Sequence, residues 1–464
     1  MSIRNGKDKQ TLPSYQPDKN SLQSITPIDG RYRPQLAAFS TSFSEFALMR
    51  YRIQVEVEYL LFLSACHVAP KLSKKQILTL RSIFTSFSAA DAEEVKRIEG
   101  VTNHDMKAIE YYLQKKCKEM HLDSLMPFVH WGITSDDTNN LAYGLALSQC
   151  NKFQMIPALE ALLNHLQQMA KQNKKSVMMA RTHGQPAVPT TFGKELATFA
   201  ARLQAQLTIL KHHQFTGKLM GAVGTLGAHR LAFPSIQWVT KSKQFVRSLG
   251  LKPVIHTTQI LPLDAWVAYF QTLATINSIV KGLSADIWTY IMLEEVQLRK
   301  KEGEVGSSTM PQKVNPIDFE NAEGNCDIAN SYFSLYEHKL LISRLQRDLT
   351  DSVVKRTFGT ALSHTYLAWK SVEKGLHKIE FDVTTAAAHL TDHYEVLAEA
   401  IQTQLRLRND EKGYEKVKQM TRGKKITKEL FQTIVSELHV ENLKNLSPEK
   451  YCGYAEELAS DTSL

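Results

Sequence analysis

The stretch WVAYFQTLATINSIVKGLSADIWTYI at residues 266–291 has the clearest hydrophobic periodicity in the chain. Large apolar side chains recur along it at spacings of three and four residues, at Trp266, Phe270, Leu273, Ile276, Val280, Leu283, Ile287 and Ile291. Because an α helix completes a turn about every 3.6 residues, this spacing places the apolar side chains on one face. The stretch therefore predicts one long helix with an apolar stripe.

Much of the remaining chain repeats this helical pattern. The stretches 156–171, 191–211 and 319–341 have a similar periodicity, and 43–63 and 91–113 also read as helical. No comparable series of alternating strand patterns separates them. Long helices joined by short polar segments predict an all-α fold built on a bundle, in which sites form from side chains on facing helices and their connecting loops. The apolar stripes fit either packing within one chain or an interface between subunits.

Composition along the chain divides it into a tail and three helical regions. The tail, residues 1–24, is polar with few large apolar groups, which is typical of a flexible, solvated segment. In the last region, Ser447 followed by a proline is a typical helix start. The expected domains are an N-terminal helical domain at 25–123, a central long-helix bundle at 124–381 and a C-terminal helical domain at 382–464.

The overall composition is that of an ordinary globular protein. Of the 464 residues, 43% are hydrophobic and 22% are charged, which argues against disorder or a fibrous repeat. The net charge of +9 is the difference between 56 basic and 47 acidic residues spread along the whole chain. Nucleic-acid binding is one interpretation of this basic balance, but small polyanionic substrates fit it equally well.

The five cysteines are odd in number, far apart and never in a CxxC pair, which argues against a disulfide framework and against a zinc site. The first residues lack the apolar segment of a secretion signal, and no run approaches the roughly 18 apolar residues of a membrane-spanning helix. We therefore expect a cytoplasmic protein with no membrane partner.

Four polar segments hold groups suited to acid–base chemistry. An elimination reaction needs a base, a group that stabilises carbanion charge, and an acid. Each segment also has a structural interpretation, as a serine-rich connecting loop, a structural histidine, or a helix cap or turn. The segments are EVGSSTMPQKVNP at 304–316 with Ser307, Ser308, Lys313 and Asn315; RTHGQPA at 181–187 with His183; TNHD at 102–105 with Asn103, His104 and Asp105; and TSDD at 134–137 with Thr134 and Ser135.

The first of these segments carries a family resemblance. GSSTMPQKVNP, in the loop at 303–316, resembles the GSSxMPxKxNP loop of the fumarase and aspartase superfamily. The resemblance implies a three-domain helical fold whose central long helices form a 20-helix core in a homotetramer. It also implies that each active site is shared by three subunits.

Within that superfamily the chain resembles the adenylosuccinate lyase family, in its longer bacterial form. Gln312 departs from the family pattern, in which His or Lys is common. The resemblance therefore does not decide how this loop closes. The other resembling segments are PIDGRY at 27–32, TNHD, TSDD, RTHGQPA, TTQI at 257–260 and SRLQRDLTDSVVKR at 343–356.

The resemblance implies elimination of fumarate from adenylosuccinate to give AMP, and from the succinylcarboxamide intermediate SAICAR to give AICAR. Ser307 is the implied base, with Ser308 as a less favoured candidate, and His183 is the implied acid. No metal or other cofactor is implied, and the histidines and carboxylates show no ligand spacing such as HExxH. The alternatives are another lyase of the superfamily, such as argininosuccinate lyase, or a helical scaffold or nucleic-acid-binding protein without catalysis.

The remaining implied site residues bind the substrate's phosphate and carboxylates, for which Arg is well suited. His104 contacts the phosphate or the carboxylates, with Asn103 and Asp105 beside it. The implied phosphate group is Arg31, Tyr32, Ser352 and Arg356; the implied carboxylate group is Thr134, Ser135, Lys313 and Asn315; and Gln259, Asn321 and Arg347 complete the pocket.

Overall fold

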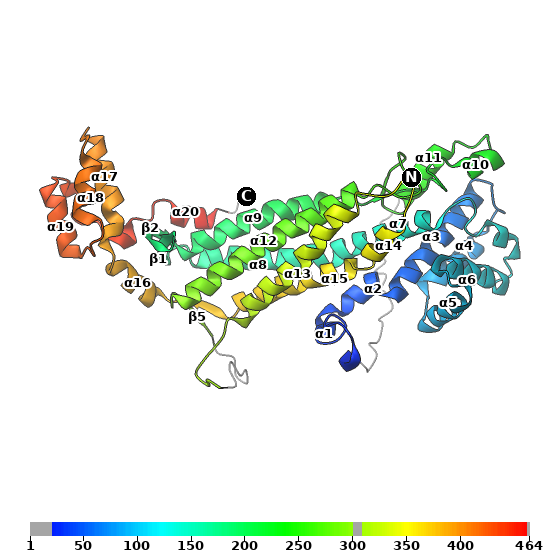
Figure 1. The fold of residues 1–464 in the computed structure, drawn as a ribbon, viewed down its shortest axis with the longest axis horizontal. Coiled ribbons are helices and arrows are strands. Elements are labelled where there is room, and N and C mark those ends of the chain that lie inside the picture. Colours follow the sequence, from blue (N-terminus) through cyan, green and yellow to red (C-terminus); the bar gives the residue numbers. More distant parts are fainter. Residues whose placement is uncertain (1–20, 300–308, 462–464) are drawn as a thin grey trace. The chain divides into compact units, whose positions relative to one another are not determined.

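The computed structural model describes residues 21–299 and 309–461 and is built mainly of helices (Figure 1). The chain forms two compact units, each discontinuous in sequence. Unit 1 contains Met1–Pro157, Leu210–Ala274 and Ile328–Tyr366, and unit 2 contains Ala158–Ile209, Thr275–Asp327 and Leu367–Leu464. The three domains expected from the sequence, with boundaries at 124 and 382, stay a prediction.

The helices found at the predicted stretches confirm the periodicity of the sequence. The stretch at 266–291 lies within α12, and every member of its apolar stripe is buried except Ile291, which is half-buried. The four predicted periodic stretches correspond to α8 (Ile156–Gln172), α9 (Phe192–His212), α12 (Asp264–Met292) and α13 (Ile317–Lys339). A further long helix, α15 (Phe358–Leu376), was not predicted.

In unit 1 an aromatic cluster packs the helices together. The ring of Phe270 lies 4.9 Å from that of Phe358 and 4.8 Å from that of Tyr336, measured between centroids. Such pairs stabilise a core beyond the burial of their area. The other helices of this unit are α1 (Arg33–Leu36), α2 (Ser40–Phe43), α3 (Glu45–Ala65), α4 (Lys74–Thr85), α5 (Ala89–Thr102), α6 (Asp105–Glu119), α7 (Ser135–Cys150), α10 (Gly227–Ala232), α11 (Trp238–Ser248) and α14 (Thr350–Lys355).

Local capping signals fix where several of these helices begin. The side chain of Ser73 accepts a hydrogen bond from the backbone of Gln76 at the start of α4, and Ser88 does the same with Asp91 at the start of α5. In both helices the side chain of the third helical residue also accepts a hydrogen bond from the backbone N–H of the cap residue. This reciprocal pair is a capping box, and it satisfies two otherwise unpaired N–H groups.

The TNHD segment separates two helices, as the turn interpretation predicts. Asn103 ends α5 in the left-handed conformation, with φ at 52°, and His104 is the N-cap of α6. Asn tolerates this conformation better than most residues because its short polar side chain bonds locally. The stretch at 91–113 is therefore two helices and not one.

Short strands also occur, and the sequence did not predict them. The RTHGQPA segment, expected as a polar loop, is part of a β-hairpin. The residues between its strands, His183 and Gly184, have φ of 54° and 73°, the pattern of a tight two-residue hairpin turn. The three two-stranded sheets are β1 (Val177–Thr182) with β2 (Gln185–Thr191), β3 (Thr216–Gly217) with β4 (Lys252–Pro253), and β5 (Val296–Leu298) with β6 (Ile379–Phe381).

The C-terminal part of unit 2 has its own core. Met179 of β1 packs in it with apolar side chains of the final helices, among them Leu397, Phe431 and Val435. The helix predicted to start at Ser447 is only a 3-10 turn, Pro448–Lys450, and the last helix begins later. The helices of this C-terminal part are α16 (Val383–Thr391), α17 (Ala398–Leu407), α18 (Gly413–Thr421), α19 (Lys428–Glu437) and α20 (Ala455–Ser460).

Candidate active site

The residues singled out in the sequence fall into both units. Ser307 and Ser308 lie outside the described residues. Unit 1 holds Arg31, Tyr32, Asn103, His104, Asp105, Thr134, Ser135, Gln259, Arg347, Ser352 and Arg356, and the described part of unit 2 holds His183, Lys313, Asn315 and Asn321.

Two of the predicted phosphate-binding residues line one pocket of unit 1. This pocket has a volume of about 1620 Å³, and Arg31 and Arg356 both lie on its wall. The PIDGRY segment reaches it through tight turns, in which the backbone N–H of Tyr32 donates to the carbonyl of Pro27 at 2.9 Å. The side chain of Arg356 is 56% exposed, so its charge is less desolvated than that of a buried cation. The carboxylates of Asp29, Glu45 and Glu93 line the same pocket, so the binding of a phosphate by Arg31 and Arg356 stays a prediction.

Asp105 contacts two arginines, one of which, Arg356, lines this pocket. Its Oδ2 lies 2.8 Å from a guanidinium nitrogen of Arg52 and 3.6 Å from one of Arg356. Burial alone raises the pKa of Asp105, but the charge and the hydrogen bond of Arg52, together with the charge of Arg356, hold it below its usual value. Arg52 also donates to Asn139 at 2.8 Å. Asp105 thus orients arginines and is itself an anion, which suits it poorly to contact a phosphate.

His104 presents its ring at the start of α6. The backbone N–H of Lys107 donates to its Nδ1 at 3.1 Å, so this nitrogen is an acceptor and the ring proton is on Nε2 in the neutral form. The side chain remains 56% exposed. A histidine held this way can donate from Nε2 to a substrate oxygen.

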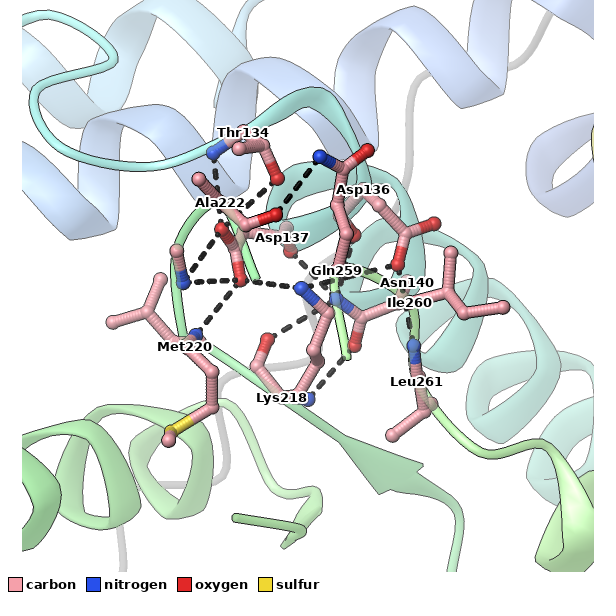
Figure 2. Close-up of polar contacts among 12 residues, drawn as sticks. Thr134, Asp136, Asp137, Asn140, Lys218, Met220, Ala222, Gln259, Ile260 and Leu261 are labelled. Carbon is pink, nitrogen blue, oxygen red and sulfur yellow. Dashed lines mark hydrogen bonds and ion pairs between the residues drawn. The ribbon is translucent and has the colours of Figure 1, made fainter. Parts of the chain in front are cut away.

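The TSDD segment forms the capped start of α7, as the structural interpretation predicts. The backbone N–H of Thr134 donates to Asp137 Oδ2 at 3.0 Å, and the Thr134 side chain completes the capping box. Asp137 is fully buried against Lys218, whose Nζ lies 2.8 Å from Asp137 Oδ1 (Figure 2). Both acidic residues of the segment are therefore engaged inside the protein, which leaves Thr134 and Ser135 as its half-buried polar groups.

Gln259 and Arg347 lie together in unit 1. Arg347 donates to Gln259 Oε1 at 2.8 Å, and Gln259 donates to the carbonyl of Ala222 at 2.9 Å. The backbone at Gly224 packs closely against the backbone of Thr257. Gly224 has φ at +79°, and a Cβ at that position would lie 2.0 Å from the carbonyl oxygen of Thr257. Only glycine fits there. The structure thus brings together two of the three residues expected to complete the pocket.

In unit 2, His183 stands at the exposed tip of the β1–β2 hairpin. Gln312 and Lys313 are exposed, and the backbone N–H of Lys313 donates to the carbonyl of Met310 at 3.1 Å. Asn321 differs from these, because its side-chain oxygen accepts hydrogen bonds from Ser371 at 2.8 Å and from Asn325 at 3.0 Å. Its amide oxygen is already used in helix packing.

Some residues that build the site were missed from the sequence. Arg52 and Lys218 carry the ionic contacts just described, but each lies far along the chain from its partner, 53 residues from Asp105 and 81 from Asp137. Local patterns carry no signal for such pairs.

Two general findings bear on the chemistry. Within residues 21–299 and 309–461, no cluster of three or more His, Cys, Asp or Glu side chains could hold a metal ion. No helix in the described part of the chain has the length and apolar character needed to cross a membrane.

Comparison with solved structures defines the class of fold. The chain superposes on the 3-carboxy-cis,cis-muconate lactonizing enzyme from Pseudomonas putida with a TM-score of 0.76 at 18% identity, covering 92% of this chain and 97% of that one. A fumarate lyase from Mesorhizobium sp. BNC1 gives a TM-score of 0.75 at 17% identity, covering 91% and 96%. A family model described as lyase matches residues 30–328. The chain therefore has the helical fold of the fumarate lyase superfamily.

Sequence comparison gives the particular family. A model of the adenylosuccinate lyase C-terminal region matches residues 343–452. The adenylosuccinate lyase of Haemophilus influenzae is 40% identical over 453 residues, covering 96% of this chain and 99% of that protein. That of Dictyostelium discoideum is 44% identical over 461 residues, covering 94% and 97%. The chain belongs to the adenylosuccinate lyase family, which confirms the resemblance drawn from its motifs.

Proposed function

We propose that this protein eliminates fumarate from adenylosuccinate to give AMP, and from SAICAR to give AICAR, in purine nucleotide biosynthesis. The observation that carries the proposal is the identity of 40% or more to adenylosuccinate lyases along nearly the whole chain. The match of the C-terminal model favours this family over argininosuccinate lyase and the other relatives of the fold.

The reaction moves one proton off carbon and one onto nitrogen. A base removes a proton from the carbon beside a carboxylate, the electron pair forms the double bond of fumarate, and the carbon–nitrogen bond breaks. The acid then protonates the purine nitrogen. The acid is His183 by resemblance to the family, and the exposure of its side chain at the tip of the β1–β2 hairpin is compatible with this role. The base is Ser307 by resemblance to the family, and backbone amides and Lys313 would stabilise its alkoxide.

The substrate's charges explain the other assignments. Arg31 and Arg356 share one pocket wall, which supports their role at the nucleotide phosphate. His104 can donate a hydrogen bond from Nε2, because its Nδ1 accepts from the backbone N–H of Lys107. The succinyl carboxylates are bound by Thr134, Ser135, Lys313 and Asn315. No cofactor takes part in this scheme, and nucleic acid is not a partner.

The test is a substrate panel with the purified full chain. Loss of adenylosuccinate and of SAICAR is followed by absorbance, and fumarate is quantified in the same samples, with argininosuccinate as the control substrate. We expect fumarate from the first two substrates and none from the third. Fumarate from argininosuccinate alone would overturn the assignment, and no fumarate from any of the three would favour a protein without catalysis.

We further propose a cytoplasmic homotetramer in which subunits share active sites. The proposal rests on the family resemblance of the GSSTMPQKVNP loop and is tested by mixing variants. If His183 and Ser307 of one site come from different subunits, exchanged His183→Asn and Ser307→Ala tetramers form some intact sites and regain activity. Mixed tetramers, shown by mass to have exchanged, that stay inactive would contradict shared sites.

A further inference from the structure

A continuous chain of buried charges runs beneath the substrate segments of unit 1. Asp137 pairs with Lys218 at 2.8 Å, and Lys218 lies 4.0 Å from Asp136 (Figure 2). Asp136 in turn lies 3.5 Å from Nζ of Lys355, which pairs with Asp351 at 2.5 Å. The side chains of Lys218 and Asp137 are 0% exposed, and that of Lys355 is 4% exposed. We call these five side chains the buried charge chain.

Burial of so many charges needs an explanation, because ion pairs of this kind add little net stability. The cost of desolvating both partners offsets their attraction, and well-packed apolar side chains often serve a fold as well or better. Burial lowers the pKa of Lys355, but the charges of Asp136 and Asp351 outweigh it and keep the pKa above its ordinary value. The lysine thus stays charged. What such a chain can supply is a fixed position for the segments that carry it.

One end of the chain holds the start of α7. Asp137 accepts hydrogen bonds from the backbone N–H groups of Met220 at 2.8 Å and Gly221 at 3.2 Å, as well as from Thr134. The carboxylate therefore locks the loop after β3 against the turn that presents Thr134 and Ser135. Asn140 strengthens this contact, because it bonds both the N–H and the carbonyl of Lys218.

The other end holds α14 and the segment around Gln259. Lys355 stands directly before Arg356 and three residues after Ser352, and it is one of the two buried residues of this six-residue helix. Asp136 accepts from the backbone N–H of Leu261 at 3.3 Å, two residues beyond Gln259. Three segments with proposed substrate contacts, far apart in sequence, thus meet on one set of charges.

We infer that the buried charge chain is a positioning device for substrate binding, and that Lys355 and Lys218 set the places of Arg356, Ser352 and the Thr134 turn without touching substrate. This inference rests on the proposed function. It assigns roles to Lys218, Asp136, Lys355 and Asp351 that the family motifs do not give them.

The test separates position from stability. Lys355→Met leaves Asp351 without its cation and Asp136 with only Lys218 at 4.0 Å, and so lowers stability. Lys355→Met with Asp351→Leu also removes the carboxylate that lost its partner, and regains stability. We expect the KM for adenylosuccinate to rise at least about tenfold in both variants, with kcat within about threefold of wild type, because only the binding contacts shift. Calorimetric titration with AMP gives a second readout that does not depend on turnover, and its Kd should rise in parallel.

A matched control is Leu80→Ala, which empties a fully buried site in α4 away from these segments. It should lower stability without changing KM or the Kd for AMP. A double variant whose KM and AMP affinity return to within about twofold of wild type as stability returns would overturn the inference and leave the proposed function intact. A wild-type protein without turnover would instead overturn the proposed function.

Discussion

The backbone N–H of Lys107 donates to Nδ1 of His104 at 3.1 Å, so one histidine both caps helix α6 and points its other ring nitrogen outward. The two roles can be separated by substitution. An asparagine keeps the cap, because its side-chain oxygen accepts the same hydrogen bond, whereas an alanine loses it.

We therefore expect His104→Ala to lower the free energy of unfolding by about 1 kcal/mol and His104→Asn to leave it nearly unchanged. Both should lower kcat/KM by roughly 10- to 100-fold, the effect of losing a hydrogen bond to a charged group. Urea unfolding and steady-state kinetics check this. A normal kcat/KM in His104→Asn would show that His104 caps the helix and does not contribute to substrate binding.

The pair of Asp105 with Arg52 predicts a particular pH dependence. Asp105 has a lowered pKa in the fold, so its contribution to stability is present above the unfolded value of about 3.9 and is lost as pH falls through the lower folded value. Asp105→Asn should lower stability by about 1–3 kcal/mol at neutral pH, since it leaves Arg52 with only Asn139.

Urea unfolding from pH 7 to pH 3 measures this effect. The difference between Asp105→Asn and wild type should be constant above about pH 4 and shrink below it. Asp327→Asn is the control, because its pair with Lys281 is exposed and such pairs contribute little. A difference that grows on acidification would have the wrong sign for this account.

Gly224 lets the segment that carries Gln259 pack closely against the backbone at position 224. Gly224→Ala puts a Cβ 2.0 Å from the Thr257 carbonyl oxygen, so the backbone must move and the bond from Arg347 to Gln259 is strained. We expect a loss of roughly 2–4 kcal/mol of stability and a raised KM. Gly250→Ala is a matched control with φ at +81° and no atom within 4 Å, and should cost only about 1 kcal/mol. An equal loss of stability in the two variants would show that only the positive φ matters at Gly224, and that the short distance to Thr257 does not.

The long helices could be predicted because their signal is local and repeated. The stripe from Trp266 to Ile287 needs only a spacing of three and four, and its members are buried. The TSDD and TNHD turns were also recognisable, because capping uses residues within three positions of each other. Their interpretation as caps is confirmed.

The β1–β2 hairpin and the buried charge chain could not be predicted in this way. Strand β1 changes register between Met179 and Arg181, and prolines interrupt β2, so neither strand alternates cleanly. Lys218 meets Asp137 across 81 residues, a contact that depends on the folded chain and leaves no mark in either local sequence. The motif resemblance named candidate site residues, and the structure shows which side chains hold their segments in place.

The central claim is that this chain eliminates fumarate from adenylosuccinate with His183 as the acid. His183→Asn tests it most directly, because asparagine tolerates the φ of 54° at this position but cannot act as an acid near neutral pH. The measurement is kcat of wild type and variant, with fumarate and AMP quantified and Tm recorded. We predict equimolar products from wild type, and a kcat at least about 10²-fold lower in the variant at an unchanged Tm. No fumarate from wild type, or near-normal kcat in the variant, would contradict the account.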